Sequence, residues 1–170
     1  KGPRPLPPIL SRDQVRALLE APYGSKRIFT RYRDRAILEL FYANGMRAGE
    51  VSALNLDDLD LAGALVKIRG GKGKPRCAPL NGPSVDTLRA YLEEARPAVA
   101  PPGQQALFLR FTGERMTSEN FSCQLNRYGK MLGIAGVSPH ALRRALATHL
   151  LENGANIVEI KTLLGHEDIS

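Results

Sequence analysis

The sequence predicts a mainly helical α+β domain that contains one small antiparallel β-sheet with a hairpin. Two observations lead to this expectation. Most of the 170 residues fall into segments whose apolar residues recur at helical spacing and whose ends carry capping residues or glycines. The exception is the region 59–80, where apolar and polar residues alternate on both sides of a Gly-Gly-Lys-Gly-Lys sequence, as they do in a hairpin.

Length and composition indicate one folded domain. A hydrophobic content of 43% is ordinary for a globular protein, and a chain of this length can bury a proper core. Residues 1–10 contain four prolines and are predicted to form an extended interdomain linker. We therefore expect the domain to occupy residues 11–170.

Charge and cysteine content restrict the class of protein. The net charge of +7 and the pI near 9.7 favour a polyanionic partner, most simply nucleic acid. No apolar run is long enough for a membrane span, and the proline-rich start does not fit a signal peptide. Cys77 and Cys123 show neither metal-ligand nor disulfide spacing, so we expect reduced, core-type thiols in a cytoplasmic protein.

Five α-helices are predicted before the last third of the chain. Their starts and stops come from capping residues, prolines and glycines. Ser11 and Gln14 form a capping box, and Asn44-Gly45 and Thr117 mark a helix end and a helix start. The expected helices cover residues 11–21, 33–44, 46–54, 84–95 and 118–132, with a short buried strand at 107–109. In the fifth helix, Phe121, Leu125, Tyr128 and Met131 are expected to face the core.

The last third predicts two more helices. Apolar residues recur at helical spacing over 140–152 and again over 157–164. Asn153-Gly154 ends the first helix, Asn156 caps the second, and Gly165 ends it.

Basic residues fall at the ends of these elements. His140 and Arg143 are three positions apart on one helix face, and His166 follows the last helix stop. Arg47 follows a glycine stop and lies three positions before Glu50, so it is well placed to meet an anion at a helix start. An imidazole beside a guanidinium can hold an oxyanion and assist proton transfer, although a solvated charge pair has the same short pattern.

Two further basic regions have open interpretations. Residues 25–35 contain five basic side chains interleaved with Phe29 and Tyr32, which suits phosphate contacts and a solvated face equally. The hairpin tip carries Lys72 and Lys74, but it leads into a strand and lacks the Gly-Lys-Ser/Thr of a nucleotide-binding loop. We therefore interpret the hairpin tip as a mobile segment whose lysine reaches into a groove.

These features in this order resemble the catalytic domain of the tyrosine recombinases, or phage integrases, of the Xer-like type. The stretches that carry the resemblance are RYRDRAILELFYANGMRAGEVSALNLDDLDL, GGKGKPRCAPL and SPHALRRALATHLLENGANIVEIKTLLGHEDIS. The resemblance implies site-specific recombination of double-stranded DNA through a 3′-phosphotyrosine intermediate, without a cofactor or metal. It also implies a tetrameric assembly of the full-length protein on DNA, whereas the chain alone is expected to be monomeric.

The resemblance also assigns roles to individual residues. Arg47 and Arg143 would clamp the scissile phosphate, with Glu50 orienting the site. His140 and His166 would bond the phosphate and assist proton transfer. Lys72 would protonate the leaving 5′ oxygen, and Lys74 competes for this role because the hairpin is about one residue shorter than usual. Candidates for contacts with the DNA backbone are Arg31, Arg33, Lys74, Arg76 and Arg144.

One departure concerns the nucleophile. The family's tyrosine is expected about nine residues after His166, and the sequence given stops at Ser170. We therefore expect this chain to be inactive in cleavage without a tail that carries the tyrosine, and expect an amino-terminal DNA-binding domain elsewhere in the protein. The alternatives are a type IB topoisomerase-like enzyme that relaxes supercoils and a non-catalytic DNA-binding module.

Overall fold

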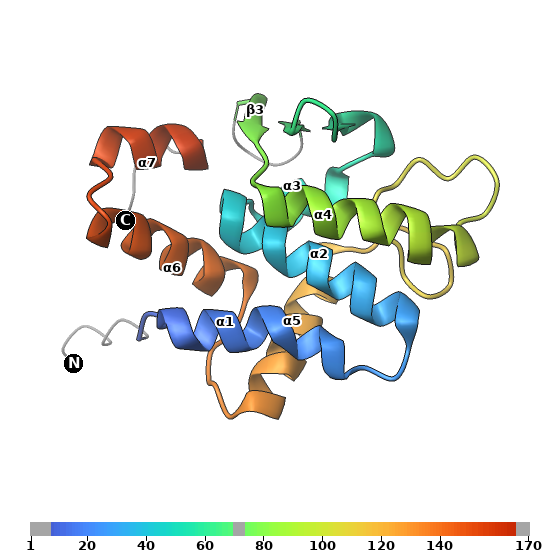
Figure 1. Cartoon of the computed structure of the whole chain (residues 1–170), viewed down its shortest axis with the longest axis horizontal. Coiled ribbons are helices and arrows are strands. Elements are labelled where there is room, and N and C mark those ends of the chain that lie inside the picture. Colours follow the sequence, from blue (N-terminus) through green and yellow to red (C-terminus); the bar gives the residue numbers. More distant parts are fainter. Residues whose placement is uncertain (1–7, 70–73, 166–170) are drawn as a thin grey trace.

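The computed structural model describes residues 8–69 and 74–165, which form seven α-helices and one small sheet at an edge of the molecule (Figure 1). Helix α2 lies at the centre and contacts α1, α3, α4 and α6 (Figure 1). Helix α5 packs against α1, α3 and α6. Helix α7 packs on α6, on the side of the molecule where the strands lie (Figure 1). The predicted mainly helical α+β class with a small antiparallel sheet is confirmed.

The first helices begin and end largely where the capping signals place them. The predicted capping box of Ser11 and Gln14 opens α1 (Arg12–Glu20), and a 3₁₀ turn follows at Ala21–Gly24. Helix α2 (Ile28–Asn44) starts five residues earlier than predicted and takes in much of the basic cluster at 25–35. Helix α3 (Ala48–Ala53) has Arg47 as its N-cap residue.

The predicted hairpin is present as part of a three-stranded antiparallel sheet. After a 3₁₀ turn at Leu56–Asp58, the order is β1 (Leu59–Asp60), β2 (Leu65–Ile68) and β3 (Arg76–Pro79). Strands β2 and β3 pair in a register that aligns Ile68 with Arg76. The side-chain amide of Asn44 donates to the carbonyl oxygen of Pro79 at 2.7 Å, which fastens β3 to the end of α2.

Among the later helices, the caps predicted at Thr117 and Asn156 are confirmed, whereas α4 and α6 begin at caps that were not predicted. Asn81 caps α4 (Gly82–Ala90), which continues as a π-helical turn at Tyr91–Ala95 and a 3₁₀ turn at Arg96–Ala98. Thr117 caps α5 (Ser118–Leu132). Helix α6 (Pro139–Glu152) has a Ser138 cap, and α7 (Ile157–Leu164) has an Asn156 cap and a left-handed Gly165 at its end.

Two sequence predictions about burial are wrong. Cys77 and Cys123 are both exposed, because Cys77 lies on the outer face of β3 and Cys123 on the outer side of α5. Met131 is 66% exposed, whereas Phe121, Leu125 and Tyr128 of the same helix are buried as predicted. The core-facing stripe of α5 therefore ends about one turn before the helix does.

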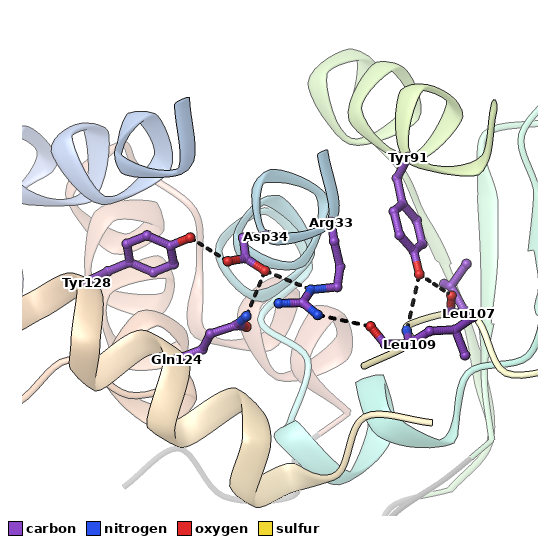
Figure 2. Close-up of polar contacts among 7 residues, drawn as sticks. All are labelled: Arg33, Asp34, Tyr91, Leu107, Leu109, Gln124 and Tyr128. Atoms are coloured by element: carbon purple, nitrogen blue, oxygen red, sulfur yellow. Dashed lines mark hydrogen bonds and ion pairs between the residues drawn. The ribbon is translucent and has the colours of Figure 1, made fainter. Parts of the chain in front are cut away.

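A buried carboxylate joins α2 to α5. Asp34 is 1% exposed and accepts hydrogen bonds from Arg33 Nε at 2.9 Å, from Gln124 at 2.8 Å and from the Tyr128 hydroxyl (Figure 2). Burial and the Asp34 charge raise the pKa of Tyr128, so this hydroxyl keeps its proton and continues to donate. The charge of Asp34 is thereby matched inside the protein.

The residues predicted as a strand at 107–109 are buried but form no strand. The Tyr91 hydroxyl donates to the carbonyl oxygen of Leu107 at 2.8 Å and accepts from the amide of Leu109 at 3.2 Å (Figure 2). The guanidinium of Arg33 donates to the carbonyl oxygen of Leu109 at 3.1 Å. The side chains of Tyr91 and Arg33 therefore form hydrogen bonds with backbone groups of Leu107 and Leu109 that a neighbouring strand could have bonded instead. An apolar run alone does not distinguish these two arrangements.

The segment before α1 is attached to α6. Leu10 is 4% exposed, and its carbonyl oxygen lies 3.0 Å from Nε2 of His149. Because a carbonyl only accepts, Nε2 carries the proton, and Nδ1 accepts from the Tyr42 hydroxyl at 2.7 Å. Arg12 adds an ion pair with Glu152 at 3.3 Å. The last turns of α6 therefore hold the residues that lead into α1.

We predict that Asp34→Ala destabilises the domain by about 3–5 kcal/mol, because it leaves the buried Arg33 charge unmatched. Urea unfolding measures the change. Asp13→Ala is the matched control, since the Asp13 side chain is 95% exposed and should change the free energy of unfolding by less than about 0.5 kcal/mol. Equal effects of the two variants would contradict a supporting role for the Asp34 cluster.

Candidate functional site

The structure brings Arg47, His140 and Arg143 together at one pocket. This pocket has a volume of about 300 Å³ and is lined by Arg47, Ala48, Ser122, Ser138, Pro139, His140 and Arg143. The residues come from the start of α3, the second turn of α5, and the cap and first two turns of α6. The prediction that the basic residues of distant helix ends converge is confirmed for these three residues.

Arg143 is held in place by the carboxyl ends of two helices. Its Nη2 donates to the carbonyl oxygen of Leu164, the last residue of α7, at 2.9 Å, and its Nη1 donates to the carbonyl oxygen of Gly45, the C-cap of α2. Carbonyl groups at helix C-termini lack partners within the helix and carry partial negative charge, which suits a guanidinium. The side chain is 4% exposed and its plane is fixed before any ligand arrives.

Arg143 and Arg47 repel each other electrostatically. Burial lowers the pKa of Arg143 to about 10, and the positive charge of Arg47 is the next cause in the same direction. Arg143 still remains protonated at neutral pH. Two guanidiniums at one pocket favour a bound anion, because its negative charge offsets their mutual repulsion.

A glycine at position 45 makes this arrangement possible. Gly45 has a φ of +59°, which ends α2 in the left-handed conformation. A Cβ atom there would overlap the side chain of Leu164 and would lie 2.9 Å from Cδ2 of Leu146. The left-handed backbone conformation therefore favours glycine, and a Cβ atom would also force the buried side chains of Leu164 and Leu146 to shift.

Glu50 and Arg76 form a second charged unit beside the pocket. Glu50 is 1% exposed and accepts from Nη1 and Nη2 of Arg76 at 2.6 Å and 3.3 Å. Its Oε1 also accepts from the backbone amide of Arg47 at 2.9 Å. The expected supporting place of Glu50 therefore has a definite geometry, with one carboxylate bonded to the N-terminus of α3 and to β3.

His140 lies at the mouth of the pocket, in the first turn of α6. Partial burial, and then the positive charges of Arg144 and Arg143, lower the pKa of His140. The ring is therefore mostly neutral near pH 7, with one nitrogen able to donate and the other able to accept.

The remaining predicted site residues have different positions. Lys72 and His166 lie outside the described residues. Lys74 and Arg31 are exposed, and Arg144 is half-buried. Arg31 lies in the first turn of α2, about 20 Å along this helix from Gly45.

Arg33 is a correction to the predicted contacts with the DNA backbone. It is 7% exposed and is bonded to Asp34 and the carbonyl oxygen of Leu109, so it supports the core rather than the surface. Arg76 is bonded to Glu50 rather than presented to solvent, with 12% of its side chain exposed.

Residues that sequence reasoning missed contribute through the backbone or through small side chains. Gly45 and Leu164 supply the carbonyls that hold Arg143, and Ser122 lines the pocket. The glycine stop was a visible signal for a helix end, but nothing in the sequence marks Ser122. Within the described ranges, no group of three or more His, Cys, Asp or Glu side chains is placed to hold a metal ion. The described helices also include none that is long and apolar enough to cross a bilayer.

Comparison with known proteins finds one family. A model described as "Phage integrase family" matches residues 8–170. The tyrosine recombinase XerC of Roseiflexus sp. (strain RS-1) is 39% identical over 173 residues, which cover 100% of this chain and 55% of that protein. The tyrosine recombinase XerD of Mycobacterium tuberculosis is 41% identical over 172 residues, covering 98% of this chain and 55% of its own length. The chain thus spans about half the length of the curated relatives it matches.

Solved structures agree with the fold. The crystal structure of XerA recombinase superposes with a TM-score of 0.85 at 30% identity, covering 98% of this chain and 58% of that chain. The structure of XerH bound to its difH substrate superposes with a TM-score of 0.81 at 24% identity, covering 96% of this chain and 48% of that chain.

We predict that Gly45→Ala destabilises the domain more than Gly133→Ala. Both glycines are left-handed C-caps, with φ of +59° and +71°, so both variants lose about 1–2 kcal/mol to backbone strain. A Cβ atom at position 45 would overlap the Leu164 side chain, whereas a Cβ atom at position 133 meets nothing within 4 Å. Overpacking should add about 1–3 kcal/mol to the loss at position 45 in urea unfolding, and equal losses would contradict the close contact with α7.

We also predict that the pKa of His140 lies below its usual value and rises in Arg144→Gln, because one of the charges that lowers it is removed. Titration of the His140 ring by NMR measures both values. A lowered pKa means that the folded state favours the neutral ring, so this group lowers stability only as the pH falls through 6.5 and below. An unchanged pKa in Arg144→Gln would show that Arg144 does not act on this ring.

Proposed function

The chain belongs to the phage integrase family, and we propose from this that it is the catalytic domain of a site-specific DNA recombinase. The observation that carries the proposal is the pocket shared by Arg47 and Arg143, which lie 96 positions apart in the sequence and come from separate helices. The names of the relatives, which are tyrosine recombinases, support the same activity.

The described residues suit attack on a phosphodiester. Such attack places growing negative charge on the non-bridging oxygens, and planar guanidiniums match that geometry through paired hydrogen bonds. Arg143 is preorganised by two carbonyls, and Arg47 lies at the N-terminus of α3, where backbone amides also favour an anion. A mostly neutral His140 can donate to a phosphate oxygen or take up a proton.

The remaining roles come from the family resemblance. Lys72 is proposed to protonate the leaving 5′ oxygen, with Lys74 as the alternative, and His166 to bond the phosphate. The nucleophile is proposed to be a tyrosine beyond Ser170. None of the seven residues that line the pocket is a tyrosine. A covalent phosphotyrosine keeps the energy of the broken ester, so the strands can be rejoined without ATP.

We propose double-stranded DNA as the partner, in line with the net charge of +7. Exposed Lys74 and Arg31 and half-buried Arg144 are the backbone contacts that fit this proposal. The full-length protein is expected to have an amino-terminal DNA-binding domain joined through residues 1–10 and to assemble as a tetramer on DNA, in the cytoplasm. The present chain alone is expected to be monomeric.

The test uses the full-length protein on a nicked suicide substrate that carries its own recombination site. A covalent protein–DNA adduct is expected, together with joining of two different duplexes. An adduct with relaxation of supercoils but no joining would indicate a topoisomerase-like enzyme. Duplex binding without an adduct would contradict the proposed catalysis.

We predict that Arg47→Gln reduces the rate of adduct formation by about 10²–10³-fold at saturating DNA, because one of the two cations facing the phosphate is lost. Duplex affinity should change by less than about threefold. Arg89→Gln removes an exposed arginine from the last turn of α4 and is the matched control, with a rate close to that of the parent. Arg143 is less suitable for this test, because its replacement also removes the bonds to α2 and α7.

A further inference from the structure

Arg76 occupies a junction between the two phosphate-binding arginines. We propose that Arg76 is a positioning residue and not a contact with the DNA backbone. It keeps Arg47 and Arg143 in their relative positions, acting through Glu50 on Arg47 and through the end of α7 on Arg143. The inference rests on the proposed function, since it concerns the same pocket.

The first side of this junction is the bond to Glu50. Two guanidinium nitrogens of Arg76 meet the two carboxylate oxygens of Glu50, at 2.6 Å and 3.3 Å. This two-point geometry fixes the carboxylate in direction as well as in place. The same carboxylate accepts from the backbone amide of Arg47 at 2.9 Å, so Arg76 fixes the first turn of α3, from which the Arg47 side chain starts.

The second side of the junction is the end of α7. Arg76 lies against Gly165, the C-cap of α7, where a Cβ would come within 2.8 Å of Nη1 and 3.0 Å of Cζ. Gly165 directly follows Leu164, whose carbonyl oxygen accepts from Arg143. Arg76 thus supports the backbone that orients Arg143, and its charge is among those that lower the pKa of Arg143.

The burial of Arg76 and Glu50 favours a positioning role for Arg76 over direct contact with DNA. The Arg76 side chain is 12% exposed and Glu50 is 1% exposed, so little of the pair faces solvent. A guanidinium that left Glu50 for a phosphate would leave a buried carboxylate unpaired, which is costly. Lys67, on the neighbouring strand β2, is exposed and offers a comparable positive charge without this burial.

The experiment compares Arg76→Gln, Arg76→Lys and the control Lys67→Gln in the full-length protein. Cleavage of the suicide substrate is measured at saturating DNA, and duplex affinity is measured over a range of salt concentrations. The parent protein is assayed first, so that failure to form any adduct counts against the proposed function and not against this inference.

We expect Arg76→Gln to slow cleavage by about 10²-fold, because a small displacement of the phosphate-binding groups has an effect of this size. Its duplex affinity and the slope of affinity against salt should match those of the parent. Arg76→Lys keeps one charged contact with Glu50 and should recover about tenfold of the lost rate. Lys67→Gln should cleave within about twofold of the parent.

The opposite pattern would overturn the inference. A residue that contacts a phosphate contributes about one unit to the salt slope, so a slope reduced by about one in Arg76→Gln, with the rate at saturation unchanged, would make Arg76 a DNA contact. An unchanged rate together with an unchanged slope would also overturn it. If Arg76→Gln fails to fold by thermal melting, Arg76→Lys decides. Because lysine keeps the charge but not the two-point bond to Glu50, a folded Lys variant that cleaves at the parent's rate counts against positioning.

Discussion

The hydrogen bonds from one buried guanidinium to the carboxyl ends of two helices determine how this end of the molecule is built. Arg143 belongs to α6, yet its donors reach the carbonyl oxygens of Gly45 and Leu164, which end α2 and α7. Three helices are therefore fixed relative to one another by a side chain that also lines the pocket. The same side chain joins three helices and lines the pocket, so a change at Arg143 alters both the packing and the pocket.

Arg47 and Arg143 place two positive charges at one pocket. Arg143 is held there by hydrogen bonds to two backbone carbonyl oxygens. Among the described residues, Glu50 is a carboxylate whose charge acts on Arg143, and it is bonded to Arg76 and to the amide of Arg47. Arg47, Arg76 and Arg143 together carry more positive charge than Glu50 alone offsets, which favours an anion at this pocket. A site neutralised by its own acidic residues would bind such an anion less well.

Much of this arrangement could be predicted from the sequence because helix starts and stops are local signals. Ser11, Thr117 and Asn156 cap the helices that they were expected to cap, and Gly165 ends α7. The burial of Arg33 could not be predicted, because its partners come from a loop more than 70 positions away as well as from its neighbour. Long-range pairing of this kind leaves no periodic trace in a single sequence, and the same holds for the bond between Arg76 and Glu50.

The attachment of Leu10 to His149 has a mechanical consequence. His149 lies six positions after Arg143 in α6, about 9 Å along the helix axis, and its ring is bonded to the backbone just before α1. A pull on the chain at Leu10 would therefore act on α6 through this hydrogen bond as well as on α1 through the backbone. The helix that carries Arg143 is thus also an anchor for the segment on the amino-terminal side of α1.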